Sequence, residues 1–357
     1  MTGAARTDVT EHKVRTGRHT SAYLAAGPED GPLIIFVHGW PELSISWRHQ
    51  LPVFAGLGFR AIAPDMRGYG RSSVYSRHED YQLRESVQDM LELLEATGRE
   101  KAIFVGHDWG APVVWSLASH HPDRCHGVAN LCVPYIKEGF APANIIPLVD
   151  RRIYPEADFP AGQWDYQLYY EESFPDAVKA FEANISNTVR MMFRKGDPSG
   201  AGQPTLLSMI RRNKGWFTPF GGQAPDLPRD EDVLTEQDLA TYVEGLSRNG
   251  MFGPDSWYMN AALNTAYARE AKNGGRIDLP VLFLHAAYDY VCETIQSDLP
   301  KPMRRDCSDL TERLVKSGHW MAQEQPAAVN AAVTQWIGLK LPGIRPSGVG
   351  GLDMTLA

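Results

Sequence analysis

The chain has 357 residues, a formal net charge of −8, and 43% hydrophobic and 22% charged residues, which is an ordinary balance for a globular protein. Its length exceeds one ordinary domain and allows a sizeable core. Lys and Arg are scattered rather than clustered, which argues against a nucleic-acid partner. No stretch approaches the roughly 18 uninterrupted apolar residues of a membrane span, so none is expected.

The N-terminus and the cysteines indicate the compartment. Residues 1–17 are polar and contain no hydrophobic signal core. The four cysteines, at 125, 132, 292 and 307, show neither CxxC spacing nor the density of a disulfide scaffold. These features predict buried thiols and a cytoplasmic location.

The first third of the chain alternates predicted strands and helices. Runs at 8–14 and 21–25 flank Gly17 and predict an opening hairpin. Continuous apolar runs predict strands buried on both faces at 33–37, 60–63, 102–105 and 127–133. Apolar spacing predicts helices at 46–57, at 81–97 with Asp80 as N-cap and Gly98 as stop, and at 111–120. This alternation predicts a parallel, doubly wound sheet.

The alternation stops at Pro134. From 135 to 274 the chain has many aromatic residues, several Gly/Pro breaks and helical stretches such as 176–192, which we interpret as an inserted, mainly helical cap domain. Strands at 279–284 and 312–315 and a helix at 326–339 then resume the pattern, and 342–357 is predicted to be irregular. The predicted architecture is an α/β core made of 1–134 and 275–357 with a helical cap at 135–274.

The sequence VGHDWG at 105–110 has the layout of a nucleophile elbow. A glycine lies two residues either side of one reactive residue, between a predicted strand and a predicted helix. Serine hydrolases have serine at the central position, whereas this chain has Asp108. Two other interpretations are an aspartate that caps the following helix, and a serine hydrolase that has lost its serine.

An aspartate nucleophile requires particular partners. With an ordinary pKa of about 3.9, Asp108 is ionised and can displace a leaving group at a saturated carbon, which forms an ester. Hydrolysis of that ester needs a general base and an oxyanion hole. In the chain order nucleophile, acid, histidine, the base is His319, and Asp289 would orient it, with Asp298 as a competitor.

The oxyanion hole is expected from two backbone amides. They belong to Trp109, which follows the nucleophile, and to Trp40, in the loop after an earlier strand. Pro41 cannot donate a hydrogen bond but directs this loop. His38 lies at the base of the loop and is expected to be structural.

Four motifs together resemble the epoxide hydrolases of the α/β-hydrolase fold, in particular the C-terminal hydrolase domain of soluble epoxide hydrolases: HGWP at 38–41, GYGRS at 68–72, GHDWG at 106–110 and GHW at 318–320. The resemblance covers residues 14–341. It includes WDYQLY at 164–169 and DSWYMN at 255–260, which are similar to the family's two tyrosine-bearing segments. The resemblance implies that Tyr166 and Tyr258 bind and protonate the epoxide oxygen. Trp40 replaces the commoner phenylalanine and leaves the backbone donor in place.

A physical argument supports two tyrosines in this role. Opening an epoxide leaves a strongly basic alkoxide, and a tyrosine with a pKa of about 10 still holds a proton to donate at neutral pH. Other tyrosines of the predicted cap, namely 169, 170 and 242, are expected to be packing residues.

The sequence thus predicts an epoxide hydrolase that makes vicinal diols through an ester of Asp108. The expected partners are a small epoxide and water, with no metal, no organic cofactor and no nucleic acid, and a homodimer is left open. Candidates for the pocket wall, each with core packing as the alternative, are Trp164, Phe217, Phe220 and Met251.

Two other functions are compatible with parts of the pattern. A haloalkane dehalogenase would use the same aspartate, and Trp109 could bind its halide, but it needs no pair of acid tyrosines. A non-catalytic ligand-binding protein could use the same scaffold. Such a protein has no need of the complete set of Asp108, Asp289, His319 and two tyrosines.

Overall fold

The computed structural model describes residues 7–344, and one sheet of eight strands lies at its centre. The strands are β1 (Thr10–Arg15), β2 (Thr20–Ala26), β3 (Leu33–Val37), β4 (Arg60–Pro64), β5 (Ala102–His107), β6 (Cys125–Leu131), β7 (Ile277–Ala286) and β8 (Cys307–Val315). Their order across the sheet is β1-β2-β4-β3-β5-β6-β7-β8. β2 is antiparallel to β1 and β4, whereas the other neighbours are parallel. The predicted mostly parallel sheet is confirmed.

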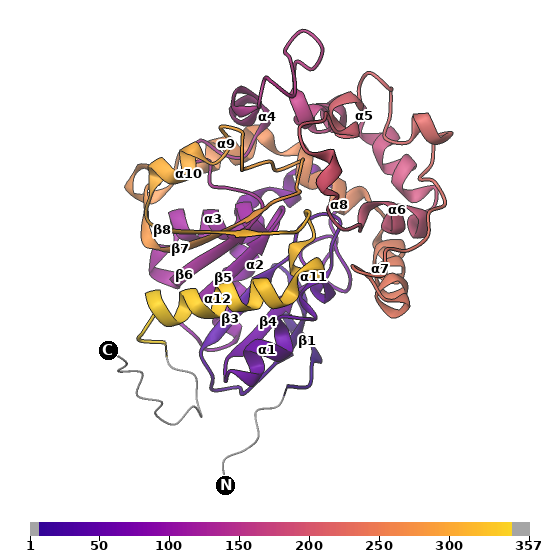
Figure 1. The fold of residues 1–357 in the computed structure, drawn as a ribbon. Coiled ribbons are helices and arrows are strands. Elements are labelled where there is room, and N and C mark those ends of the chain that lie inside the picture. Colours follow the sequence, from indigo (N-terminus) through magenta and orange to yellow (C-terminus); the bar gives the residue numbers. More distant parts are fainter. Residues whose placement is uncertain (1–6, 345–357) are drawn as a thin grey trace.

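Helices cover both faces of this sheet, as the doubly wound pattern predicts. They are α1 (Leu51–Gly56), α2 (Leu83–Ala96), α3 (Gly110–His120), α4 (Pro142–Ile145), α5 (Asp165–Glu182), α6 (Ile185–Met192), α7 (Glu236–Asn249), α8 (Phe252–Ser256), α9 (Ala261–Ala268), α10 (Lys301–Asp306), α11 (Met321–Glu324) and α12 (Pro326–Lys340). In Figure 1, α12 crosses the near face of the sheet and α3 lies on the far face. No helix in residues 7–344 is both long enough and apolar enough to cross a membrane.

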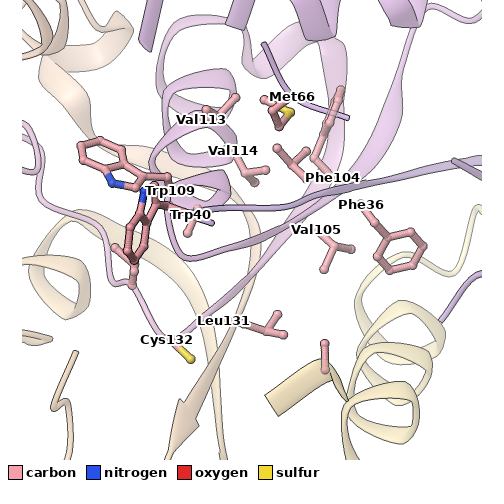
Figure 2. Close-up of a cluster of buried hydrophobic side chains, with 14 of the residues drawn as sticks. Phe36, Trp40, Met66, Phe104, Val105, Trp109, Val113, Val114, Leu131 and Cys132 are labelled. Atoms are coloured by element: carbon pink, nitrogen blue, oxygen red, sulfur yellow. The ribbon is translucent and has the colours of Figure 1, made fainter. Parts of the chain in front are cut away.

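The central strands are mostly apolar because both of their faces are buried. Every residue of β3 and β5 is buried. Figure 2 shows Phe104 on the side of the sheet that α3 covers, together with Val113 and Val114, while Val105 points to the opposite side. Neither face of these strands can therefore accept a polar side chain without a partner, which explains the continuous apolar runs.

The segment between β6 and β7, residues 132–276, consists of helices and turns, and we call it the helical insertion. In Figure 1 its helices, α4 to α9, gather over one end of the core. The longest, α5, is bent at Ser173, which has non-helical backbone angles, just before Pro175. The exact boundaries of a cap domain at 135 and 274 remain a prediction. Of the predicted irregular tail, residues 342–344 are in neither a helix nor a strand, and 345–357 lie outside the described residues.

Two predicted helices were wrong in detail. The stretch 46–57 is divided into a short 3-10 helix, Ser44–Trp47, and α1. Pro52 lies in the first turn of α1, where its missing N–H leaves no bond unmade, so it begins a helix rather than continuing one. The stretch 176–192 falls across α5 and α6. The side chain of Asn184 caps α6 by accepting from the N–H of Asn187, which starts a new helix.

The predicted N-cap of the helix at 81–97 was also wrong. α2 begins at Leu83, and Asp80 lies instead in a 3-10 turn, where its carboxylate accepts hydrogen bonds from Arg77. Asp80 therefore binds the side chain of Arg77 instead of capping a helix. The apolar spacing of the helix does not reveal this partner. The predicted stop is confirmed, because Gly98 has a φ of +70° just beyond the end of α2.

Candidate active site

Asp108 lies in the sharp turn between β5 and α3. Its φ of +49° is in the left-handed region, which costs a non-glycine residue on the order of 1–3 kcal/mol. The turn is possible because the residues two positions before and after Asp108 are glycines. A Cβ at Gly106 would lie 2.6 Å from the carbonyl oxygen of Gly110, and one at Gly110 would overlap the carbonyl of Val37. The elbow predicted from the glycine spacing is therefore present, and it holds the Asp108 side chain away from the strand.

The two oxygens of the Asp108 carboxylate face different partners. Oδ1 accepts the backbone N–H of Trp40 at 2.6 Å. Oδ2 lies 3.4 Å from Nε2 of His319. A Cβ at Gly39 would collide with the Asp108 side chain and would lie 2.5 Å from the backbone nitrogen of Trp109, so this nitrogen is next to the same carboxylate. Figure 2 shows the Trp40 and Trp109 side chains, which follow β3 and β5 in the chain.

His319 is held by the carboxylate expected from the chain order. Its Nδ1 donates to Oδ2 of Asp289 at 2.7 Å, which leaves Nε2 facing Asp108. Oδ1 of Asp289 accepts the backbone N–H groups of Val291 and Cys292, each at 3.0 Å. The competitor, Asp298, is about half exposed and forms an ion pair with Lys301. The structure thus brings together Asp108, His319 and Asp289, and not Asp298.

Electrostatics favour the charged form of His319. Burial alone would lower its pKa, but the carboxylates of Asp289 and Asp108 outweigh burial and raise the pKa well above the ordinary value of 6.5. Burial alone would also raise the pKa of Asp289, yet the bonds from His319 and from two backbone amides hold it below 3.8. The free site is therefore an imidazolium between two carboxylates.

Tyr166 and Tyr258 lie near Asp108 and come from the helical insertion. Tyr166 is the second residue of α5, and Tyr258 lies in the 3-10 helix Trp257–Met259. The centroids of their rings are 5.6 Å apart, and the Tyr258 ring meets the Trp109 ring edge-on at 5.2 Å. Burial raises the pKa of both hydroxyl groups well above 10, and the charge of nearby Asp108 adds to this effect. Both tyrosines are therefore protonated at neutral pH.

The four candidates for the pocket wall lie in different surroundings. Trp164 is fully buried, with its ring centroid 6.4 Å from that of Tyr166. Phe217 and Met251 are also buried, whereas Phe220 is 41% exposed. Sequence reasoning missed Trp216, whose ring lies 5.6 Å from Tyr166. Aromatic residues are frequent in this segment, so no sequence signal distinguished Trp216 from its neighbours.

Sequence reasoning also missed a buried pair under the site, His107 and Glu42. Nδ1 of His107 is 2.7 Å from Oε1 of Glu42, and its Nε2 is 2.7 Å from the backbone carbonyl oxygen of His319. Because both partners are acceptors, both ring nitrogens must carry protons. Burial opposes the charge, but Glu42 raises the pKa of His107 to about 10, and the His107 charge lowers the pKa of buried Glu42 to about 2. This ion pair connects the elbow to the loop that carries His319.

Two groups of side chains near His319 have the composition of a metal site. They are His107, Cys132 and His319, and Asp289, Cys292 and His319, with ligand atoms within 4.8 Å in each group. Both ring nitrogens of His107 already make hydrogen bonds, and Nδ1 of His319 donates to Asp289. A metal ion would have to displace these bonds, so the arrangement fits a hydrogen-bonded network better than a metal centre. The third histidine of the region, His38, accepts the N–H of Met66 at 2.9 Å, as its expected structural role requires.

Comparison with known proteins identifies relatives along most of the chain. The alpha/beta hydrolase fold family matches residues 32–326. Bifunctional epoxide hydrolase 2 of Sus scrofa is 32% identical over 309 residues, which are 86% of this chain and 51% of that protein. Epoxide hydrolase B of Mycobacterium tuberculosis is 32% identical over 370 residues, which cover 94% of this chain and 99% of that protein. The chain thus spans about half the length of the bifunctional relative and nearly all of the mycobacterial one.

Comparison with solved structures also identifies epoxide hydrolases as similar proteins. Epoxide hydrolase A from Mycobacterium thermoresistibile superposes with a TM-score of 0.75 and 31% identity, over 93% of this chain and 98% of that one. An epoxide hydrolase from an endophytic Streptomyces superposes with a TM-score of 0.74 and 29% identity, over 92% of this chain and 95% of that one.

Proposed function

Because this chain belongs to the epoxide hydrolases of the alpha/beta hydrolase fold family, we propose that it converts an epoxide and water into a vicinal diol through an ester on Asp108. One observation carries the proposal. A carboxylate, rather than a serine hydroxyl, lies between the Trp40 amide and the imidazole of His319, and Tyr166 and Tyr258 are near enough for its charge to raise the pKa of their hydroxyl groups. This arrangement suits attack at a saturated carbon followed by hydrolysis of an ester.

The first half-reaction is alkylation of Asp108. Oδ2 attacks a ring carbon of the epoxide while the Trp40 amide holds Oδ1. The carbon–oxygen bond of the ring breaks, and the released oxygen takes a proton from Tyr166 or Tyr258. Their raised pKa keeps this proton available, and the alkoxide is basic enough to remove it. The product is a glycol monoester of Asp108.

The second half-reaction is hydrolysis of that ester. Esterification removes the negative charge of Asp108, one of the two that raise the pKa of His319, so His319 can release its proton to the solvent and act as a base. It takes a proton back from the solvent once the diol has left. Its Nε2 takes a proton from a water molecule that attacks the Cγ carbon of Asp108. The amides of Trp40 and Trp109 stabilise the negative charge that develops on Oδ1. The leaving diol oxygen takes one proton of the water, and the other returns to the tyrosine.

The covalent route can be tested with styrene oxide. The His319→Gln variant should form the ester without hydrolysing it, so mass spectrometry should find one substrate mass on the peptide that contains Asp108. The matched Asp108→Asn variant should show no adduct. In the wild type, one turnover in heavy-oxygen water should label Asp108. A diol that forms without label in Asp108 would exclude the ester mechanism.

The same assays separate the alternatives. Halide release from a chloroalkane without diol formation from styrene oxide would favour a dehalogenase, and the absence of both reactions would favour a ligand-binding protein. Trp164, Phe217, Phe220 and Met251 are proposed to line the pocket, which comparison of alanine variants on aryl and alkyl epoxides would test. A cytoplasmic location and a homodimer remain proposals, to be tested by cell fractionation and by size-exclusion chromatography with light scattering.

A further inference from the structure

We propose that Asp255 is a positioning residue for both half-reactions, because its carboxyl group holds in place the two aromatic side chains that orient Tyr258 and the Trp40 amide. This inference rests on the proposed function. Asp255 itself does not touch the reacting atoms. It acts through Trp40 and Tyr170, and the geometry of those two contacts carries the argument.

Asp255 is completely buried within α8, in the helical insertion. Its Oδ1 accepts hydrogen bonds from the indole N–H of Trp40 at 2.8 Å and from the hydroxyl of Tyr170 at 3.3 Å. Its Oδ2 has no hydrogen-bond partner among the described residues. Burial raises the pKa of this carboxyl group well above 3.8. A buried carboxyl group in which only one oxygen has hydrogen-bond partners destabilises a fold. The presence of Asp255 at this position therefore calls for a functional explanation.

The first contact leads to Tyr258. Tyr170 lies one helical turn after Tyr166 on α5, and its ring stacks on the Tyr258 ring with centroids 4.4 Å apart and planes only 7° from parallel. Trp40 meets the same ring edge-on, at 5.8 Å and 79°. Tyr258 is thus packed against two aromatic rings that are both bound to Oδ1 of Asp255. Their common acceptor fixes the position of the Tyr258 ring, and with it the direction of the hydroxyl that would protonate the epoxide oxygen.

The second contact leads to the oxyanion hole. The backbone N–H of Trp40 donates to Oδ1 of Asp108, while the indole N–H of the same residue donates to Asp255. Asp255 therefore holds, through the Trp40 side chain, the same loop whose amide binds Asp108. A phenylalanine at position 40 would keep the amide but have no side-chain N–H to donate. Trp40 and Asp255 thus form a pair that links the core to the helical insertion.

The test uses rapid-quench kinetics with styrene oxide, which gives separate rates for ester formation and ester hydrolysis. Asp255→Leu removes the acceptor, and we expect both rates to fall by about 10- to 100-fold, the range for misplaced catalytic groups. Asp255→Asn keeps an oxygen acceptor and should stay within about fivefold of wild type. Trp40→Phe removes one donor and should slow ester hydrolysis more than the Asn variant does. Melting temperature and near-UV circular dichroism show whether each variant is folded.

A purely structural role is distinguished by combining variants. If Asp255 acts on ester formation through Tyr258, then Asp255→Leu should slow that step by no more than about twofold when Tyr258 is already phenylalanine. An equal slowing in both backgrounds would overturn the inference, as would unchanged rates in Asp255→Leu. If Asp255→Leu does not fold, the pair Asp255→Asn and Trp40→Phe decides, and wild-type rates in Trp40→Phe would overturn the inference.

Failure of the proposed function has a different signature. If the His319→Gln variant forms no ester on Asp108, both the mechanism and this inference fall together. If that ester forms and Asp255→Leu has no effect on either rate, only the inference about Asp255 is wrong.

Discussion

Replacing Glu42 by glutamine should destabilise the protein by about 3 kcal/mol. The fall in the pKa of Glu42 from 4.5 to about 2 corresponds to this free energy, because each tenfold change in proton affinity is worth about 1.4 kcal/mol. It also agrees with the roughly 3–5 kcal/mol lost when one partner of a buried ion pair is removed. The rise in the pKa of His107 reports the same pair and is not added to it.

The loss should depend on pH in a definite direction. Glu42 has a lowered pKa in the folded protein, so its contribution is present above pH 4.5 and is lost as the pH falls toward about 2. His107 has a raised pKa, so its contribution is complete below pH 6.5 and is lost as the pH rises toward about 10. The ion pair therefore stabilises the protein most between pH 4.5 and 6.5.

Urea unfolding of the wild type and Glu42→Gln at about pH 5.5, 7.5 and 9.5 measures this difference. We expect it to be largest at the lowest of the three values and to shrink steadily toward the highest. The double variant Glu42→Gln/His107→Gln is the control, and it should recover part of the loss because it removes the unpaired buried charge. A difference that stays constant with pH, or that is below about 1 kcal/mol at pH 5.5, would refute an ionised pair.

Three further predictions concern the reaction. Gly39→Ala should lower kcat by at least about 100-fold, because its Cβ would collide with the Asp108 side chain and the Trp109 amide. Circular dichroism should show little change in helix content, and near-normal turnover would contradict this geometry. Asp289→Asn should slow ester hydrolysis by about 10⁴-fold and ester formation far less, because the wrong tautomer of His319 is then favoured. Rapid-quench kinetics measures both rates, and equal slowing of the two would argue against Asp289 as the residue that orients His319. The fraction of enzyme present as the ester at steady state should increase as the pH is lowered from about 8 to about 5.5, because hydrolysis needs neutral His319. Mass spectrometry of quenched samples measures this fraction, and a decrease over the same range would exclude His319 as the base.

The local sequence predicted the fold, and it predicted that Asp108, His319 and Asp289 lie close together, for a physical reason. Buried parallel strands must be continuously apolar, and a strand-to-helix turn at Asp108 requires glycines at fixed spacing. Asp289 and His319 follow β7 and β8, whose carboxyl ends lie at the same edge of the sheet as that of β5. The topology therefore brings the three side chains together without any detail of side-chain packing.

The partners that side-chain packing selects were not predictable in this way. Glu42 and His107 are 65 residues apart, and Trp40 and Asp255 are 215 residues apart. No periodicity or spacing connects positions on separate elements at such distances. Tyr170 was expected to be a packing residue, and it does pack, but its hydroxyl also binds Asp255. Whether a buried polar group has a partner is decided only when separate elements of the chain pack against one another.

In the proposed mechanism, the two half-reactions also differ in which parts of the chain supply their groups. Alkylation takes its nucleophile from the turn after β5 and its acids from α5 and the 3-10 helix Trp257–Met259, so it needs the helical insertion to be correctly placed on the core. Hydrolysis of the ester draws Asp108, Asp289, His319 and both amides from outside residues 132–276. Sequence exchange in the helical insertion that keeps Tyr166, Tyr170, Asp255 and Tyr258 should therefore change which epoxide is accepted, while the groups that hydrolyse the ester stay in place. Directed evolution of selectivity should accordingly be freest in this segment.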